Sequence, residues 1–264
     1  MTLPGPPPPE LSTPLAQAAA RLGTLSPELV WYEEVSSTND VAAVLAEHGE
    51  PEGRVVAANA QLAGRGRHGR TWISPPGAGI YASVVLRPRP SAVPLLTIAA
   101  GLAIAEGIER ATGLRLDLKW PNDVHAGRRK VAGVLAEASS SAYLQHVIVG
   151  FGINVMRAAY PPEVASRATS LEEELGRAVD RGLVLAECLS SLATRYDGLQ
   201  RGCVEEVRGQ WRLRAGASLG RRVRWNAAER THEGVAEDID ADGALLVRTG
   251  GAIARIASSE VTWL

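Results

Sequence analysis

The chain has 264 residues, of which 45% are hydrophobic and 22% are charged, and its formal net charge is −1 at pH 7. These values are ordinary for a globular protein with a buried core, and the length allows one large domain with a small one, or two medium ones. The near-neutral charge excludes a generally basic nucleic-acid-binding coat, although it permits a local positive cleft.

The N-terminal segment PGPPPPELSTP, residues 4–14, lacks the basic and apolar regions of an export signal. We interpret residues 1–28 as a flexible, solvated proline-rich tail followed by a short helix. The longest apolar run, Leu95 to Ile108, is rich in Ala and Gly and contains Glu106. Such a run is typical of a buried helix and falls short of a membrane span.

Residues 29–214 show strand-like and helix-like patterns in mixed order, which predicts a large α+β domain with a mixed β-sheet and flanking helices. Alternation and turn residues predict strands at Leu29–Val35, Arg54–Gln61, Gly79–Pro88, Leu114–Val124 with a break at Pro121, Arg129–Ala138 and His146–Val155. Periodicity and capping residues predict helices at Val41–Gly49, Leu95–Thr112, Leu183–Leu199 and Cys203–Arg214. The stretch Met156–Ser170 lacks periodicity, and we expect it to be a mobile loop.

Residues 215–264 have a different texture, with short alternating segments separated by Asp242-Gly243 and Gly250-Gly251. This pattern predicts a small all-β barrel. A unit of this size is near the lower limit for independent folding, so we expect it to pack on the large domain. We interpret its aromatic residues Trp225 and Trp263 as core residues, which disfavours a peptide- or RNA-binding module.

The segment GRGRHGR, Gly64 to Arg70, has three glycines in the G-x-G-x-x-G spacing and three arginines. Flexible backbone N–H groups and guanidinium groups make a good cradle for phosphate and carboxylate oxygens. A dinucleotide-binding fold is excluded because its glycine turn opens directly into a helix, whereas here a strand follows and the next helix starts near Leu95. We expect the empty loop to be mobile, since it has repelling arginines and no apolar anchor.

Lysine occurs at only two positions. Lysine and arginine total 28, and since only Lys119 and Lys130 are lysines, 26 are arginines. A chain that uses arginine almost everywhere has kept lysine in KWPND and in GRRKVAG, which suggests that a compact ammonium is needed there. Asp123 of KWPND could ligate Mg²⁺ or order the turn.

The remaining reactive residue types show no site of their own. The cysteines, Cys188 and Cys203, lack metal-ligand spacing and are interpreted as buried or idle thiols of a reducing compartment, so we expect a cytoplasmic protein. The five histidines show no ligand spacing either. Only His68 could take part in ligand binding, because it lies in the glycine-arginine loop, but we expect its side chain to face solvent.

Five segments together resemble the biotin protein ligases, enzymes that attach biotin to carboxylase carrier domains. In chain order they are SSTN at Ser36–Asn39, QLAGRGRHGRTW at Gln61–Trp72, KWPNDV at Lys119–Val124, RKVAGVLAE at Arg129–Glu137 and GFGINV at Gly150–Val155. The resemblance runs from about Trp31 to the C-terminus. It implies a class II synthetase-like catalytic domain at residues 29–214 and an SH3-like barrel at residues 215–264.

The resemblance also implies a role for each matching residue. Biotin would be bound by Ser37, Thr38, Asn39, Gln61, Arg65, Gly66, Arg67 and Lys130. ATP and the adenylate would be bound by Arg65, Arg67, Trp72, Lys119, Asn122, Lys130 and Asn154. Arg65, Lys119 and Lys130 would act in catalysis. Asp123 is the candidate to orient or deprotonate the acceptor lysine, and the candidate Mg²⁺ ligand.

The implied reaction makes biotinyl-5′-AMP from biotin and ATP, releases pyrophosphate, and transfers biotin to a lysine of a biotin carboxyl carrier domain. The attacking carboxylate is ionised at neutral pH, so neither a general base nor a nucleophilic triad is required. Neutralising phosphate charge in a closed site matters most. The expected substrates and cofactor are biotin, ATP and Mg²⁺, the expected partner is the carrier domain of acetyl-CoA or a related carboxylase, and the expected state is a monomer or homodimer.

Two alternative functions are disfavoured. The sister family of lipoate and octanoate ligases shares the fold and the acyl-adenylate strategy, but lacks this pairing of GRGRHGR with KWPND. Bifunctional biotin ligases are also DNA-binding repressors through an N-terminal winged helix. A folded domain of that kind needs at least roughly 50 residues, whereas about thirty precede the first predicted strand, so we expect no sequence-specific DNA binding.

Overall fold

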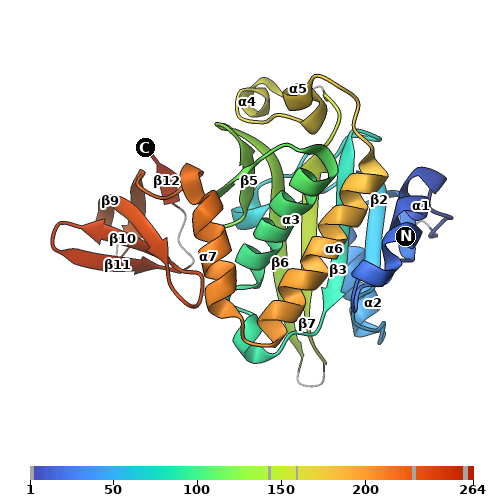
Figure 1. Cartoon of the computed structure of the whole chain (residues 1–264), viewed down its shortest axis with the longest axis horizontal. Helices are drawn as coiled ribbons and strands as arrows, with labels where there is room; N and C mark the ends of the chain where they lie inside the picture. The colour runs from blue at the N-terminus through green and yellow to red at the C-terminus, as the bar shows by residue number, and fades with distance from the viewer. Residues whose placement is uncertain (1–2, 142–143, 159, 228–229, 258–260) are drawn as a thin grey trace.

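The computed structural model describes residues 3–141, 144–158, 160–227, 230–257 and 261–264. Within these ranges the chain forms a large sheet with flanking helices and a smaller C-terminal sheet, and helix α7 (Val204–Arg214) lies between them (Figure 1). No helix in the described ranges is long and apolar enough to cross a membrane.

The large sheet has seven strands in the order β1-β2-β3-β7-β6-β5-β4. The strands are β1 (Leu29–Val35), β2 (Val55–Gln61), β3 (Gly79–Leu86), β4 (Asp117–Lys119), β5 (Asp123–Ala126), β6 (Arg129–Ser141) and β7 (Leu144–Asn154). β1 and β2 pair in parallel and the other neighbours are antiparallel, which confirms the predicted mixed sheet. The segment expected as one broken strand forms β4 and β5, which pair with each other across the turn at Pro121.

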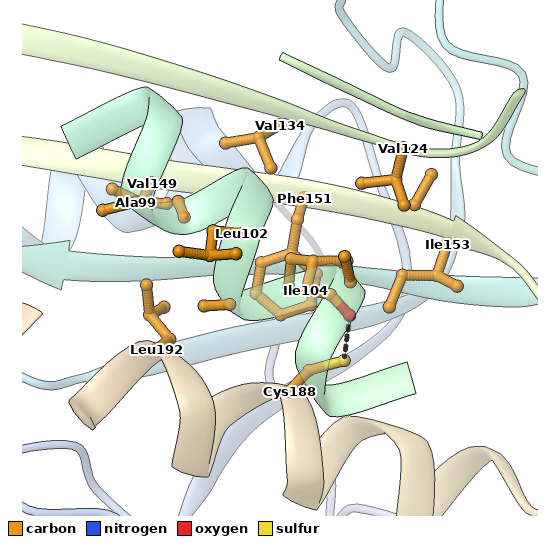
Figure 2. Packing of buried hydrophobic residues seen from close by; sticks show 14 of the residues in the cluster. Ala99, Leu102, Ile104, Val124, Val134, Val149, Phe151, Ile153, Cys188 and Leu192 are labelled. Atoms are coloured by element: carbon orange, nitrogen blue, oxygen red, sulfur yellow. Dashed lines mark hydrogen bonds between the residues drawn. The ribbon is translucent and has the colours of Figure 1, made fainter. Parts of the chain in front are cut away.

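Helices α3 (Leu96–Thr112) and α6 (Arg181–Gln200) cover one face of this sheet (Figure 1). α3 is buried along most of its length, as its apolar composition predicts. Figure 2 shows Phe151 of β7 in this layer and the thiol of Cys188 on α6, whose sulfur lies 3.7 Å from the carbonyl oxygen of Ile104. Burial raises the pKa of the Cys188 thiol, which confirms it as an inert core residue, and Cys203 is a free, half-buried thiol.

Helix α2 (Thr38–Glu47) covers part of the opposite face, where Val41 packs in a small cluster with Ile148 of β7. Side chains alternate between the faces of a strand, so the next two residues on this face of β7 are Gly150 and Gly152. Two glycines in succession leave the sheet surface bare beyond α2. This bare surface is the floor of the candidate site.

The small sheet contains β8 (Arg222–Ala227), β9 (Arg230–Ile239), β10 (Leu245–Thr249), β11 (Ala252–Ile256) and β12 (Val261–Trp263). Its order is β11-β10-β9-β8-β12, and every neighbouring pair is antiparallel. This confirms a second, all-β unit at the C-terminus. Among the described strands β11 and β12 do not pair with each other, so closure into a barrel stays a prediction.

The N-terminal segment differs from the solvated tail that we predicted. Helix α1 (Pro9–Ala18) starts within the proline run, where a first-turn proline costs no hydrogen bond, and Gly5 forms a β-bridge with Trp31. Leu11 and Leu15 are buried in the main core. The prediction is wrong for this part because leucines four residues apart form an apolar stripe on a helix, and α6 buries that stripe.

The stretch predicted as an irregular loop is partly helical and attached to the sheet. It contains α4 (Pro162–Ala165) and is followed by α5 (Leu171–Leu175). Its backbone flanks β6, since Lys130 N–H donates to Arg167 O at 2.8 Å and Thr169 N–H donates to Lys130 O at 2.9 Å. Mobility of the stretch stays a prediction, and its residue 159 lies outside the described ranges.

Candidate active site

A cavity of about 480 Å³ opens over the glycines of β7. Residues from β2, β4, β5, β6 and β7, from the glycine-arginine loop and from β12 form its walls. The predicted site residues all line this cavity: Ser37, Thr38, Asn39, Gln61, Arg65, Gly66, Arg67, Trp72, Lys119, Asn122, Asp123, Lys130 and Asn154. The fold therefore brings together side chains from five separate motifs, although their individual roles stay predictions.

One end of the cavity is held by neutral hydrogen bonds. The backbone N–H and Oγ1 of Thr38 donate to Gln61 Oε1 at 2.8 and 3.1 Å. Gln61 Nε2 in turn donates to Ser74 Oγ at 2.9 Å, and Ser83 Oγ lies 2.8 Å from Thr38 Oγ1. Ser37, Thr38 and Ser83 are buried. This end is built from the start of α2, the end of β2, Ser74, and Ser83 of β3, and we call it the neutral end.

Asn39 connects the neutral end to the glycine-arginine loop. It is buried, with Oδ1 lying 2.6 Å from Ser83 Oγ and Nδ2 donating to Glu137 Oε2 at 2.5 Å. Glu137 also lies 3.1 Å from Arg65 Nη2, and Arg65 Nη1 lies 2.7 Å from Asp40 Oδ1. The loop was expected to carry only repelling arginines. In this structure Arg65 is instead neutralised by two carboxylates from different elements.

The glycine-arginine loop folds back on itself between β2 and β3. Gly66 N–H donates to Arg70 O at 2.6 Å, and Trp72 N–H donates to Gly64 O at 2.8 Å. His68 is exposed, as predicted, and takes a positive φ of 55° at the tip. The loop contains only a three-residue 3₁₀ turn and no α-helix, which agrees with rejection of the dinucleotide-binding fold.

Trp72 lies on the bare strand surface. A Cβ atom at Gly152 would approach the indole ring to 2.3 Å, and one at Gly133 would approach it to 3.2 Å. The Trp72 Nε1 donor is buried and has no hydrogen-bond partner among the described residues. The Lys130 ammonium lies 5.1 Å from the Trp72 ring centroid, within range of a cation–π interaction.

The other end of the cavity is cationic, and we call it the charged end. Lys130 Nζ lies 2.6 Å from Asp123 Oδ1, and Lys119 Nζ lies 5.8 Å from the ring centroid of Trp263. Burial lowers the pKa of Lys119 despite the opposing charge of Asp123, and burial also lowers the pKa of Arg67. Desolvation of these cations makes the charged end receptive to anions.

Two predicted nucleotide-facing residues also hold the cavity walls. Asn122 Nδ2 donates to Val134 O at 2.8 Å, which fixes the KWPND turn against β6. Asn154 is buried and its Nδ2 donates to Thr169 O at 2.9 Å, which fixes the segment that follows α4. Mutation of either asparagine would therefore disturb the walls as well as any contact with a ligand.

The residues present do not fit a Mg²⁺ ion held by the protein. The carboxylate of Asp123, the predicted ligand, is engaged by Lys130. Within the described ranges no three His, Cys, Asp or Glu side chains are grouped to hold a metal ion. Asp123 lies at the start of β5, opposite Lys119 in the hairpin register. Its carboxylate therefore provides negative charge close to both lysines.

Several residues in or next to the cavity were not predicted as site residues, and four of them lie beside predicted ones. Asp40 and Glu137 hold Arg65, and both adjoin quoted motifs, since Asp40 follows SSTN and Glu137 ends RKVAGVLAE. His125 lines the cavity, its Nε2 is buried without a partner, and burial lowers its pKa to about 4. Trp263 was interpreted as a core residue, but it is only half-buried and lines the cavity. His125 also had such a signal, since it directly follows KWPNDV, whereas Trp263 had none.

Comparison with known proteins identifies the family. Residues 31–154 match the biotin/lipoate A/B protein ligase family, and residues 218–262 match the biotin protein ligase C terminal domain. The bifunctional ligase/repressor BirA of Bacillus subtilis (strain 168) is 34% identical over 256 residues, which cover 94% of this chain and 78% of that protein. The biotin–[acetyl-CoA-carboxylase] ligase of Mycobacterium tuberculosis is 35% identical over 240 residues, which cover 88% and 87%.

Solved structures agree with these relatives. A biotin protein ligase from Aquifex aeolicus in complex with biotin and ATP is similar with a TM-score of 0.78 and 32% identity, covering 90% of this chain and 98% of that one. A biotin protein ligase from Leishmania major in complex with biotinyl-5-AMP has a TM-score of 0.63 and 25% identity, covering 88% and 99%. The chain therefore belongs to the biotin protein ligase family of enzymes.

Proposed function

We propose that this protein activates biotin with ATP as biotinyl-5′-AMP, releases pyrophosphate, and transfers biotin to one lysine of a biotin carboxyl carrier domain of acetyl-CoA or a related carboxylase. The observation that carries the proposal is the two-ended cavity. Its neutral end suits an uncharged hydrogen-bonding ring, and its charged end suits carboxylate and phosphate groups. The similar structure with bound biotin and ATP supports this choice of ligands.

At the neutral end, Ser37, Thr38 and Gln61 would bind the ureido ring of biotin. Gln61 is already oriented by Thr38 and Ser74, so little side-chain freedom remains to be lost on binding. Asn39 would bind beside them, held in place by Ser83 and Glu137. A preformed neutral pocket would place the ring of biotin so that its carboxylate reaches the cations of the charged end.

At the charged end, Arg65, Lys119 and Lys130 would stabilise the transition state of the first step. A biotin carboxylate oxygen attacks the α-phosphorus of ATP, a C–O–P bond forms, and the bond to pyrophosphate breaks. The charge that develops on the phosphate oxygens needs fixed cations in a dry site. Arg67, Trp72, Asn122 and Asn154 would bind the nucleotide, with Gly66 allowing close approach of the loop backbone.

In the absence of ligand, two of the cations of the cavity form ion pairs with carboxylates of the protein. Arg65 is paired with Asp40 and Glu137, and Lys130 with Asp123. A bound carboxylate or phosphate would therefore exchange one anionic partner for another. This exchange lowers the cost of keeping cations in a half-buried cavity without ligand.

In the second step the amine of the carrier lysine attacks the acyl carbon of the adenylate, an amide bond forms, and AMP leaves. Asp123 is the carboxylate of the charged end, and once Lys130 contacts phosphate it would either orient the incoming amine, whose proton then passes to water, or accept that proton itself. Mg²⁺ enters this proposal as part of the MgATP substrate, because the described residues offer no group of three His, Cys, Asp or Glu ligands for it.

The test is incubation with biotin, MgATP and a biotin carboxyl carrier domain, followed by mass spectrometry of the carrier. We expect the mass of one biotinyl group on one lysine, with AMP and pyrophosphate as products. Lipoate in place of biotin is the control for the sister family, and preferential transfer of lipoate would contradict the proposal. Omission of ATP controls for non-enzymatic acylation.

Repressor activity is a separate matter, because some of the relatives are named as repressors. In the described part of the chain the residues before β1 form α1 and a 3₁₀ turn, and α1 packs in the core of the ligase. We propose that these N-terminal residues support the ligase core and do not themselves bind an operator. A gel shift that detects sequence-specific, salt-dependent DNA binding would contradict this.

A further inference from the structure

We infer that Trp263 of the C-terminal sheet is a positioning residue for Lys119, so that the small sheet completes the charged end of the cavity. The contact between Trp263 and Lys119 matters for catalysis only if the proposed function is correct, and the inference rests on that function. It assigns to one side chain, far away in sequence, the task of holding one of the two lysines of the chain.

The contact joins the two sheets. Trp263 lies on β12, which pairs with β8 through the register of Trp263 with Val223 and of Val261 with Trp225. The backbone that carries Trp263 is therefore held in the C-terminal sheet. Its face lies 5.8 Å from the Lys119 ammonium, and Val261, Thr262 and Trp263 all line the same cavity as Lys119.

The two lysines are held by different partners. Lys130 has an ion pair with Asp123 and the Trp72 ring. Lys119 lies across the β-hairpin from Asp123, whose carboxylate oxygen is engaged by Lys130. The face of Trp263 therefore offers Lys119 a partner that attracts the ammonium without consuming its charge or its donors. An ammonium held in this way remains available to phosphate oxygens.

The backbone beside Lys119 is bonded to residues that flank the strands of the C-terminal sheet. Trp120 N–H donates to Ser218 Oγ at 2.8 Å, and Ser218 Oγ lies 3.2 Å from Leu118 O. The indole N–H of Trp120 donates to Gly243 O at 2.8 Å. Both neighbours of Lys119 are thus bonded to the C-terminal part of the chain. These bonds hold the backbone of Lys119, and the pairing of β12 with β8 holds the backbone of Trp263.

The first test is spectroscopic and needs no catalysis. With ¹³C-labelled lysine the protein has only two lysine side chains to observe, Lys119 and Lys130, and Lys130→Arg assigns them. A ring current from Trp263 shifts the Lys119 Hε signal upfield. We expect Trp263→Leu to move the Lys119 signal toward its free value and to leave the Lys130 signal in place. Trp72→Leu is the matched control and should move only the Lys130 signal.

The second test separates ATP use from biotin binding. For Trp263→Leu we expect KM for ATP in adenylate formation to rise roughly 3- to 30-fold, with the affinity for biotin unchanged, because an aromatic cation contact is lost only at the charged end. Trp263→Phe keeps an aromatic face and should recover most of the loss. In a Lys119→Met background, Trp263→Leu should have no further effect on the KM for ATP.

The inference is overturned if the Lys119 signal is unmoved by Trp263→Leu, or if the effect on KM persists undiminished in the Lys119→Met background. Should Trp263→Leu fail to fold, Trp263→Phe removes less volume and should still move the Lys119 signal part of the way toward its free value, because the ring current of benzene is weaker than that of indole. The proposed function fails separately, when the wild-type protein forms no biotinyl-5′-AMP. In that case the NMR comparison still decides whether Trp263 holds Lys119.

Discussion

The two ends of the cavity are stabilised in different ways. At the neutral end, Thr38, Gln61 and Ser83 are tied by hydrogen bonds between uncharged groups on α2, β2 and β3, and they lie close to the core. At the charged end, Lys130 is paired with a carboxylate and an aromatic ring, and Lys119 with the ring of Trp263.

This difference explains how one end of the cavity can stay rigid while the other end rearranges when a ligand binds. Neutral hydrogen bonds among buried groups are costly to break, because a lost partner leaves a buried polar atom unsatisfied. Ion pairs that are partly exposed are worth little, because water and salt screen them. We expect the neutral end to keep its shape without ligand, and the charged end to exchange partners when an anion enters.

The largest expected effect comes from removing a cation from the charged end. Lys130→Met should lower the rate of biotinyl-5′-AMP formation by roughly 10²–10³-fold, the usual loss for one preorganised donor to a developing charge. Pyrophosphate release measures it. Lys130→Arg is the control that keeps the charge and should lose less. A loss below tenfold for Lys130→Met would contradict a catalytic role.

The two glycines of β7 allow the ends to be disturbed separately. A Cβ at Gly150 would lie 2.0 Å from Asn39 Oδ1, and one at Gly152 would lie 2.3 Å from the Trp72 ring. Gly150→Ala should weaken biotin binding and destabilise the fold by about 1–3 kcal/mol, because Asn39 has no room to move. Gly152→Ala should mainly impair use of ATP. Calorimetric binding of biotin and urea unfolding distinguish them, and identical profiles would remove the distinction between the ends.

The buried His125 makes the stability of the protein depend on pH. Its native pKa of about 4, lowered by burial, lies below the ordinary value of 6.5, so the unfolded chain binds more protons between these values and stability falls as pH falls through this window. Between pH 7 and pH 5 we expect His125 to cost about 2 kcal/mol of unfolding free energy. His125→Leu should lack this component in urea titrations at both pH values. Parallel pH curves for the two proteins would show that His125 does not titrate in this way.

The smallest effect on stability is expected at the ion pair of Arg65 with Asp40, where both side chains are substantially exposed. Asp40→Asn should change the free energy of unfolding by less than about 1 kcal/mol. It should also release Arg65 toward the cavity, so the affinity for the adenylate rises slightly or stays equal. A strong loss of stability would show that this pair is structural and not exchangeable.

The sequence alone determined most of the elements. Alternation located the strands near Leu29, Gly79 and His146, and helical periodicity located α3 and α6. The resemblance of five short motifs to the biotin protein ligases predicted the family and the residues that line the cavity. These features can be read locally because a strand repeats every two residues and a helix every 3.6 residues, and because each motif is short.

Tertiary structure alone decided which groups meet. The burial of α1 depended on a partner helix, α6, more than 160 residues further along the chain. The pairing of Arg65 with Glu137 and the approach of Trp263 to Lys119 depend on the register of β6 and on the docking of the small sheet. Such contacts have no local signature, since they arise only when long-range strand order brings distant side chains to one face. Sequence patterns thus determined what each segment is, and packing determined what each side chain touches.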